Sequence, residues 1–308
     1  MIWLIVAILA YLFFALASLG DKIVLKKTPK PKLYAFYVSF LSFLVLLALP
    51  FVDLNYPIKD VFFWAFLDAI VYVWGLYIIF CALERYEVSR VIPTTGAVQP
   101  IFIFLIALIV WPSASLVLDQ ASLIAFFLLL LGGIMISAEK NYVVTRDSVG
   151  LSFFAAFLFS LDFIFQKFVF LKTDLISGFI LIRLFVVFVS LFFLFDKEVR
   201  SGILKKEGKG ETGIIFLLAQ ASGGLATVFQ SWAIVLVPVG YLAIVNALRG
   251  VQYVFLFILT TLFSFYLPRY LKEKASKKIL IQKIIAVIII IIGLFILIKY
   301  GNYMSIDF

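Results

Sequence analysis

Long apolar runs recur along this chain and leave few structures open to it. A helix needs about 20 apolar residues to cross the hydrocarbon core of a bilayer. Ten such runs cover residues 2–24, 33–52, 62–83, 90–110, 120–138, 150–171, 177–195, 213–236, 241–266 and 280–298. The runs are unbroken rather than alternating, which argues against a strand barrel. The sequence therefore predicts an all-α integral membrane protein with ten transmembrane helices.

The composition supports a membrane protein and excludes several kinds of site. Of the 308 residues, 65% are hydrophobic and 14% are charged, whereas soluble domains have about 45–50% and about 25%. Histidine is absent and Cys81 is the single cysteine, so a zinc or haem site, a Cys-His nucleophile pair and an intramolecular disulfide are excluded. Gly-rich phosphate loops are also absent, and we expect no metal and no other cofactor.

The positive charge collects in particular loops. The net charge of +9 would suggest a nucleic-acid partner in a soluble protein. Here the odd-numbered loops between the expected spans, with Arg90 at the edge of the fourth span, hold 18 Lys and Arg residues, while the even-numbered loops and the tails hold 3. Because Lys and Arg are enriched in cytoplasmic loops, we expect no nucleic-acid partner, odd-numbered loops in the cytoplasm and both termini outside.

The two halves of the chain resemble each other. The segment KIVLKKT at 22–28 aligns with KFVFLKT at 167–173, and later Gly75-Leu76 aligns with Gly224-Leu225. Near the ends of the halves, Ala125 and Gly132 align with Ala286 and Gly293. We expect a first repeat at 1–138, a connecting loop at 139–149, a second repeat at 150–299 and a tail at 300–308. Since each repeat has five spans, the two would sit inverted in the membrane, as in many secondary transporters.

The fourth run, Val88–Val110, is apolar overall but polar in its first half. Pro93 and Pro100 each remove a backbone donor, so we expect them to bend or open the helix. Freed carbonyl groups are tolerated in a membrane only against protein or a water-filled cavity. The hydroxyl and amide groups nearby belong to Thr94, Thr95 and Gln99. One interpretation is a helix that lines a transport cavity; the other is a packed membrane helix with tolerated prolines.

Taken together, these features resemble the EamA-like family of the drug/metabolite transporter superfamily. The resemblance is carried by Ala82-Leu83 at the end of the third span, by the proline-bearing fourth span, and by the segments GGIMIS at 132–137 and GLFILI at 293–298. It implies a ten-helix bundle with a central cavity that exports or imports small metabolites by alternating access.

Two features depart from that family. Its usual glutamates before the fifth and tenth spans are matched only by Asp119 and, loosely, by Glu273. The family also usually keeps both termini in the cytoplasm, opposite to the orientation that the loop charges predict. The direction of transport therefore stays open.

Arg249 is the charged residue that most strongly suggests a binding site. A charge in the hydrocarbon core needs a partner, a cavity or a nearby interface, and Arg249 lies well inside the ninth span. A guanidinium group is suited to a carboxylate or a phosphate. Helical spacing places four polar residues on one face, namely Asn246, Arg249, Gln252 and Tyr253. The structural alternative is an ion pair between Arg249 and an acid on another helix.

The sixth and eighth spans hold further candidates. Asp162 and Gln166 share a helical face at i and i+4, and Gln230 lies in the eighth span. Asp162 could carry a proton or contact an ammonium group, or it could neutralise Arg249 or Arg183. Asp68 is a further acid within an apolar run. For Lys167, near the end of its span, we expect the side chain to reach toward the membrane surface.

The favoured hypothesis is a secondary transporter for a small polar or amphipathic metabolite, such as an amino acid or a nucleotide-linked sugar. The expected partners are this small molecule, membrane lipids and a coupling ion, with a homodimer left open. The alternatives are an integral membrane enzyme acting on lipid-linked substrates and a structural membrane protein. The enzyme hypothesis would need acidic or nucleophilic residues clustered at one membrane face, whereas the loops carry mainly Lys and Arg.

Overall fold

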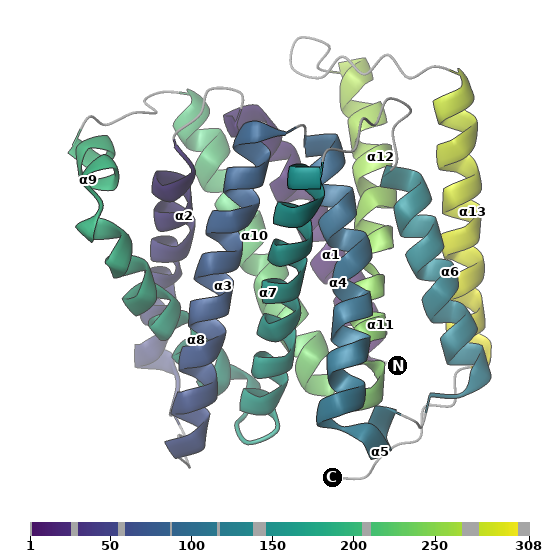
Figure 1. The fold of residues 1–308 in the computed structure, drawn as a ribbon, viewed down its shortest axis with the longest axis horizontal. Coiled ribbons are helices and arrows are strands. Elements are labelled where there is room, and N and C mark those ends of the chain that lie inside the picture. Colours follow the sequence, from purple (N-terminus) through teal and green to yellow (C-terminus); the bar gives the residue numbers. More distant parts are fainter. Residues whose placement is uncertain are drawn as a thin grey trace.

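The computed structural model describes residues 2–25, 30–54, 59–86, 88–115, 118–137, 146–204, 211–266 and 277–300. Helices form almost all of these residues, and no strand occurs among them (Figure 1). The α-helices are α1 (Ile2–Leu25), α2 (Pro31–Phe40), α3 (Lys59–Arg85), α4 (Val88–Val110), α5 (Pro112–Ser115), α6 (Gln120–Ser137), α7 (Arg146–Phe170), α8 (Leu175–Ser190), α9 (Lys197–Leu204), α10 (Glu211–Leu236), α11 (Leu242–Ala247), α12 (Arg249–Tyr266) and α13 (Lys277–Tyr300). Short 3₁₀ helices at Leu41–Phe51, Leu191–Phe195 and Val239–Tyr241 extend α2 and α8 and precede α11.

Eight helical stretches in the described residues are long and apolar enough to cross a membrane. They are Ile2–Gly20, Pro31–Phe51, Lys59–Arg85, Val149–Phe170, Leu175–Phe195, Gly213–Leu236, Val239–Leu262 and Ile279–Tyr300. Large apolar side chains point outward from them and from the other helices, such as Phe51 and Phe195, which are 86% and 81% exposed. Such a surface suits lipid rather than water. The protein is therefore a multi-pass, all-α membrane protein.

The expected fourth and fifth spans are the two that fall short of this length. Their apolar helical stretches are Thr94–Val110 and Gln120–Ile136. A stretch of about 17 residues is the lower limit for a transmembrane helix. The count of ten spans therefore stays a prediction, although helices occupy all ten expected positions.

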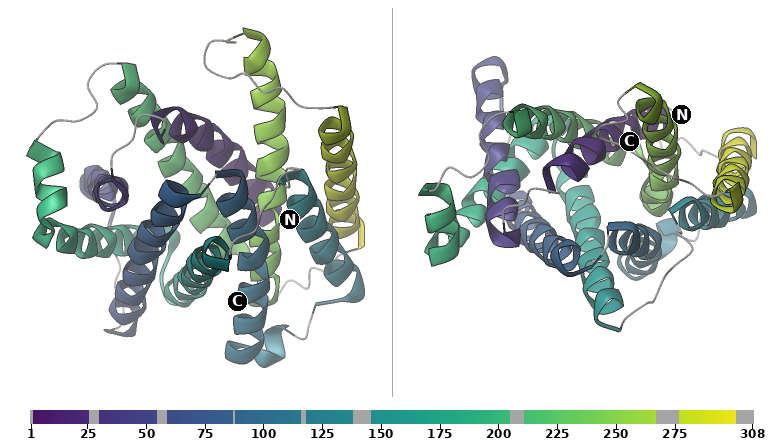
Figure 2. Two further views of the ribbon diagram at one scale, coloured as in Figure 1. Left: turned by 45° about the horizontal axis from the view of Figure 1, so that its top comes forward. Right: turned by 90° about the horizontal axis from the view of Figure 1, so that it is seen from above.

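The helices pack as one bundle, with α9 at one edge and α13 at the other (Figure 2). The closest neighbours are far apart in sequence: α1 lies along α10, α3 along α7, and α6 along α13. The second helix α2 lies against α3 and α8. Most long helices thus take their main partner from the other half of the chain.

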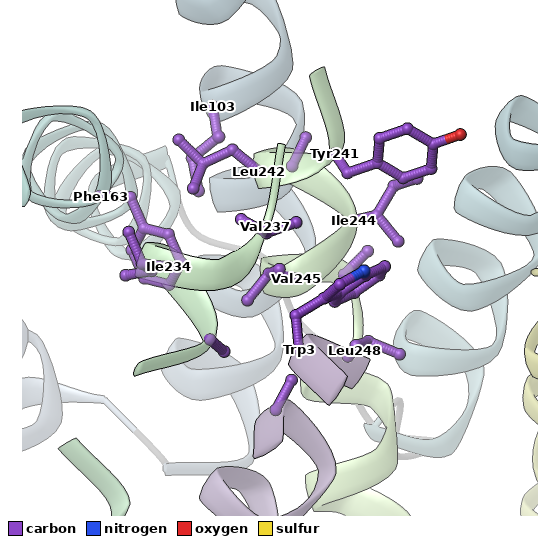
Figure 3. Close-up of a cluster of buried hydrophobic side chains, with 14 of the residues drawn as sticks. Trp3, Ile103, Phe163, Ile234, Val237, Tyr241, Leu242, Ile244, Val245 and Leu248 are labelled. Atoms are coloured by element: carbon purple, nitrogen blue, oxygen red, sulfur yellow. The ribbon is translucent and has the colours of Figure 1, made fainter. Parts of the chain in front are cut away.

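The ninth expected span is interrupted, and its first part lies at the centre of the bundle. All six residues of α11 are buried. Figure 3 shows Leu242, Ile244 and Val245 from this segment among Trp3 of α1 and Ile103 of α4. The sequence predicts a continuous helix over 241–266, whereas the structure has α11 ending at Ala247, a turn at Leu248 and α12 starting at Arg249.

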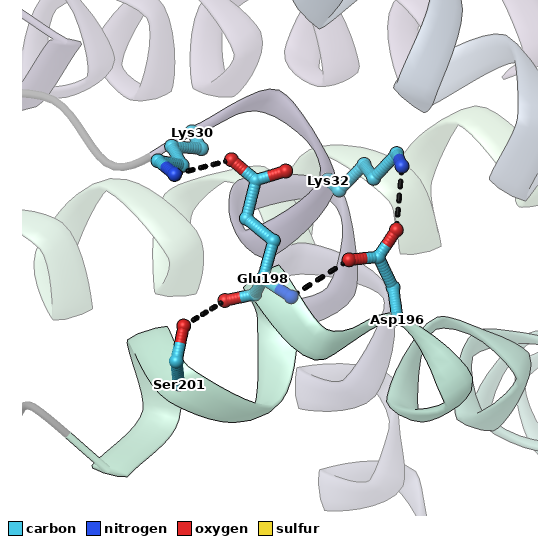
Figure 4. Close-up of polar contacts among 5 residues, drawn as sticks. All are labelled: Lys30, Lys32, Asp196, Glu198 and Ser201. Carbon is cyan, nitrogen blue, oxygen red and sulfur yellow. Dashed lines mark hydrogen bonds and ion pairs between the residues drawn. The ribbon is translucent and has the colours of Figure 1, made fainter.

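The predicted polar loop at 196–211 contains a short helix that is fixed to α2. Lys30 pairs with Glu198 at 2.7 Å and Lys32 with Asp196 at 2.5 Å (Figure 4). The Asp196 carboxylate also accepts the backbone N–H of Glu198 at 2.8 Å, which caps α9. The hydrogen bond from Lys32 lowers the pKa of Asp196 below its usual range. These contacts tie the start of the second expected span to the end of the seventh.

Candidate functional site

Gln99 connects three helices inside the bundle. Its side-chain Oε1 accepts a hydrogen bond from Nη1 of Arg249 on α12 at 2.7 Å, and its Nε2 donates to the carbonyl of Phe159 on α7 at 3.2 Å. Its own backbone carbonyl accepts the Ser160 hydroxyl at 3.0 Å. Gln99 is nearly fully buried, while Arg249 is half-buried. The fourth and ninth expected spans therefore meet through two of the predicted site residues.

A glycine on α4 allows this approach. A Cβ atom added to Gly96 would collide with the Tyr253 hydroxyl and would lie 3.3 Å from Cδ of Arg249. The Tyr253 hydroxyl donates to the carbonyl of Ile92 at 3.4 Å, and Thr95 donates to the carbonyl of Ser152 at 3.4 Å. The polar first half of α4 is thus packed against α7 and α12.

The two prolines of α4 do not end the helix. The structure assigns one α-helix from Val88 to Val110 that runs through Pro93 and Pro100, and Pro100 is buried. Bending at these prolines stays a prediction. Thr94, one residue before Thr95, is half-buried.

The helical break lies in the ninth expected span, where the Tyr11 hydroxyl of α1 bonds to a backbone carbonyl beside it. The Tyr11 hydroxyl donates to the carbonyl of Val245 at 2.7 Å. In a continuous helix that carbonyl would accept the N–H of Arg249. On the same helix, the Ser18 hydroxyl accepts a hydrogen bond from Nε2 of Gln252 at 3.1 Å. Tyr11 and Ser18 were not predicted as site residues, and their polar groups within an apolar run are the signal that could have found them.

The break also divides the polar face predicted for the ninth span. Asn246 lies before it, whereas Arg249, Gln252 and Tyr253 follow it on α12. Asn246 is 0% exposed, and neither atom of its amide has a hydrogen-bond partner among the described residues. An unsatisfied buried group costs about 1–3 kcal/mol. The Asn246 amide is therefore a buried polar group without a partner beside the helix break.

A second group of polar side chains, buried except for the half-buried Tyr72, lies between α3, α7 and α8, and we call it the acid cluster. It consists of Asp68, Tyr72, Asp162, Gln166 and Arg183, all in the interior of their helices. The Asp68 and Asp162 carboxyl groups interact electrostatically with each other and with Arg183, and neither oxygen of Asp68 has a hydrogen-bond partner among the described residues. The Arg183 guanidinium lies over the Tyr72 ring, 5.0 Å from its centroid.

Gln166 links the acid cluster to α10. Its Nε2 donates to Oδ1 of Asp162 at 3.1 Å, across the predicted i, i+4 spacing. Its Oε1 accepts the Ser231 hydroxyl at 3.4 Å. Gln230, the neighbour of Ser231, is buried as well. Within the described part of the chain, Gln230 forms no hydrogen bond to the other candidate residues.

The Lys167 side chain is buried against α10 and is not extended into solvent as predicted. It is 1% exposed, and its ammonium donates to three carbonyls, those of Ile234, Val235 and Val237, at 2.8, 3.3 and 2.6 Å. These carbonyls lie at the C-terminal end of α10, where helical acceptors have no intrahelical donor and a cation is favourable. Lys167 thus caps the C-terminal end of α10. The side chain of its aligned residue, Lys22, lies outside the described residues.

The two acids aligned with the family's glutamates have different outcomes. Asp119 precedes α6 and accepts the backbone N–H of Ser122 at 3.2 Å, which is a helix cap. The Ser122 hydroxyl in turn bonds to the Tyr241 hydroxyl at 3.1 Å. Glu273 lies outside the described residues. The described residues contain no group of three or more metal-ligating side chains.

Comparisons with known proteins show the fold alone. No protein-family model and no curated protein matches the sequence. A solved structure described only as "Crystal structure of protein" matches with a TM-score of 0.67 over 95% of this chain and 94% of its own. The two sequences are 14% identical. The whole bundle therefore has the fold of that solved protein.

Proposed function

We propose that this protein is a secondary transporter in the cell membrane for a small metabolite that carries an anionic group, such as an amino acid or a nucleotide-linked sugar. The metabolite would bind between α4 and α12. Rocking of the two halves would then expose it to each side in turn.

The pairing of Arg249 carries this proposal. Its guanidinium bonds to the uncharged amide of Gln99, and no carboxylate lies within ion-pair distance of it among the residues that the structure describes. A positive charge at membrane depth needs compensation. A carboxylate or phosphate of a substrate would supply it in the planar geometry that a guanidinium favours. The buried amide of Asn246 lies three residues away and would bind a neutral polar group of the same molecule.

Reciprocal contacts support the ten-span, inverted-repeat architecture that is part of this proposal. A Cβ added to Gly132 would meet Ala286 and Ile290, while one added to Gly293 would meet Ala125 and Leu129. The two glycines correspond to each other in the alignment of the halves, and so do the residues that they meet. The helix pairs behave likewise, because α1 with α10 is matched by α7 with α3, and α1 with α12 by α7 with α4. A two-fold axis in the membrane plane relates such pairs in EamA-like proteins, which this chain resembles.

Uptake by proteoliposomes tests the proposal. Purified protein would first be screened by thermal shift against amino acids and nucleotide sugars, since a ligand of the folded state raises its stability. Flux of the best ligand would then be measured for Arg249→Ala and for Lys283→Ala, a matched loss of a cation that lies over the Phe257 ring.

Loss of a buried charge contact costs about 2–5 kcal/mol, so we expect at least about a tenfold loss of flux for Arg249→Ala and none for Lys283→Ala. Flux that survives Arg249→Ala would remove Arg249 from the site. Absence of any ligand-dependent flux would contradict transport itself.

A further inference from the structure

The acid cluster brings two carboxyl groups together in the interior of the bundle. Asp68 on α3 is 0% exposed and Asp162 on α7 is 5% exposed. The two groups interact electrostatically, and neither oxygen of Asp68 has a hydrogen-bond partner among the described residues. An ionised carboxylate that is buried without a partner is strongly disfavoured. Asp68 is fully buried and unpartnered in this way, so its carboxyl group is stable there when it holds a proton.

The charges around the pair allow one ionised carboxylate. From α8, Arg183 faces both acids, and from α3, Tyr72 lies beneath its guanidinium. From α7, Gln166 contributes an uncharged amide, and from α12, Arg249 acts on Asp162 electrostatically while it bonds to Gln99. Two like charges in a buried pair oppose each other, and one adjacent guanidinium compensates one of them.

The hydrogen bonds decide which acid is ionised. Gln166 donates to Oδ1 of Asp162 at 3.1 Å, and a donated hydrogen bond stabilises a carboxylate. Asp68 has no such donor among the described residues. The proton therefore resides on Asp68.

We propose that Asp68, Asp162 and Arg183 form a proton-binding site, with Asp68 holding the exchangeable proton. On release, the proton leaves the Asp68 carboxyl for water and no other bond changes. Two negative charges then face each other between α3 and α7.

Because it lies between α3 and α7, the proton-binding site also has a role in transport, and this role rests on the proposed function. In the proposed architecture α3 belongs to the first repeat, while α7 and α8 belong to the second. Loss of the proton would therefore add repulsion across the interface along which the halves rock. Proton release would favour separation of α3 from α7, and proton binding would favour their closure, so that a proton gradient drives the metabolite.

Infrared spectroscopy tests proton binding without any substrate. The protein would be reconstituted in lipid and titrated with pH in H₂O and D₂O. We expect a carboxylic-acid C=O band that shifts in D₂O, disappears at high pH and is lost in Asp68→Asn. The control is Asp60→Asn, at an exposed acid of the same helix that pairs with Lys172 at 3.1 Å. The control should keep the band.

Three results would overturn the proton site. One is a wild-type protein with no titrating acid band, which needs no variant to be folded. Another is a band that Asp68→Asn and Asp162→Asn both leave unchanged. The third is a band that disappears on addition of sodium at constant pH, which would assign the acid cluster to a metal cation instead.

A second assay tests coupling. In proteoliposomes with a pH gradient we expect wild type to accumulate its metabolite and Asp68→Asn to lose accumulation while it retains exchange at equal pH. Accumulation by Asp68→Asn equal to wild type would overturn the coupling role. If no ligand is transported at all, the proposed function fails, while the infrared result still decides whether the acid cluster binds a proton.

Discussion

Replacing Lys167 by methionine tests how much this residue stabilises the C-terminal end of α10. The ammonium of Lys167 donates three hydrogen bonds, to the carbonyls of Ile234, Val235 and Val237, between 2.6 and 3.3 Å. The next residue, Pro238, has no N–H to offer. Methionine fills a similar volume and carries no donor, so the substitution removes the bonds without opening a large cavity.

The magnitude follows from the number of bonds and the cost of the charge. If each hydrogen bond contributes about 1 kcal/mol, the three sum to about 3 kcal/mol. Transmembrane hydrogen bonds are on average weaker, at about 0.6 kcal/mol, and removal of a buried ammonium recovers part of its desolvation cost. We therefore expect Lys167→Met to lower the free energy of unfolding by about 1–3 kcal/mol.

Reversible unfolding in mixed detergent micelles measures this difference. Lys283→Met is the control, because Lys283 lies on α13 over the Phe257 ring, 5.3 Å from its centroid, and closes no helix. It should change stability by less than about 0.5 kcal/mol. Equal unfolding of Lys167→Met and wild type would refute the reasoning, since it would mean that the three carbonyls find other donors.

Two further predictions concern packing and pH. Gly250 lies directly after Arg249, and a Cβ there would lie 3.2 Å from the Leu129 carbonyl on α6, so Gly250→Ala should lower thermal stability, whereas Gly150→Ala, in open space, should not. Burial raises the pKa of Asp174, but the hydrogen bonds that it accepts from the first turn of α8 outweigh this and lower it. Its capping contribution is thus present above the pKa of the unfolded chain and is lost as pH falls through the folded value; Asp174→Asn should remove this part of the pH dependence of unfolding.

The positions of the helices could be predicted because the bilayer sets their length. The run at 213–236 became α10, Glu211–Leu236, and the run at 62–83 became α3, Lys59–Arg85. The break in the ninth span could not be predicted in this way. The prolines suggested a bend in α4, which is continuous. The break at Leu248 lies instead beside a hydrogen bond from Tyr11 to Val245, 234 positions apart in the sequence. Local propensity contains no information on such a contact.

The candidate site was also predictable only in part. Asp162 and Gln166 are hydrogen-bonded because one helix turn separates them, and this spacing is visible in the sequence. The bond from Arg249 to Gln99 spans 150 positions, and only the alignment of the two halves suggested that their helices correspond. The position of Asp68 opposite Asp162 had no signal, because neither periodicity nor alignment says which helix faces α3.

If the halves are repeats, they carry different residues at corresponding positions because other helices cover one half and not the other. The alignment that matches Gly75 with Gly224 places Leu217 of α10 opposite Asp68 of α3. Leu217 is 59% exposed, whereas Asp68 is fully buried. The reason is that α8 lies along α3, while α2 lies against α3 and α8. An acid facing lipid would cost at least about 2.5–3.5 kcal/mol, so a carboxyl pair is tolerated only on the covered side of the bundle. The uncovered side must keep an apolar residue at that position.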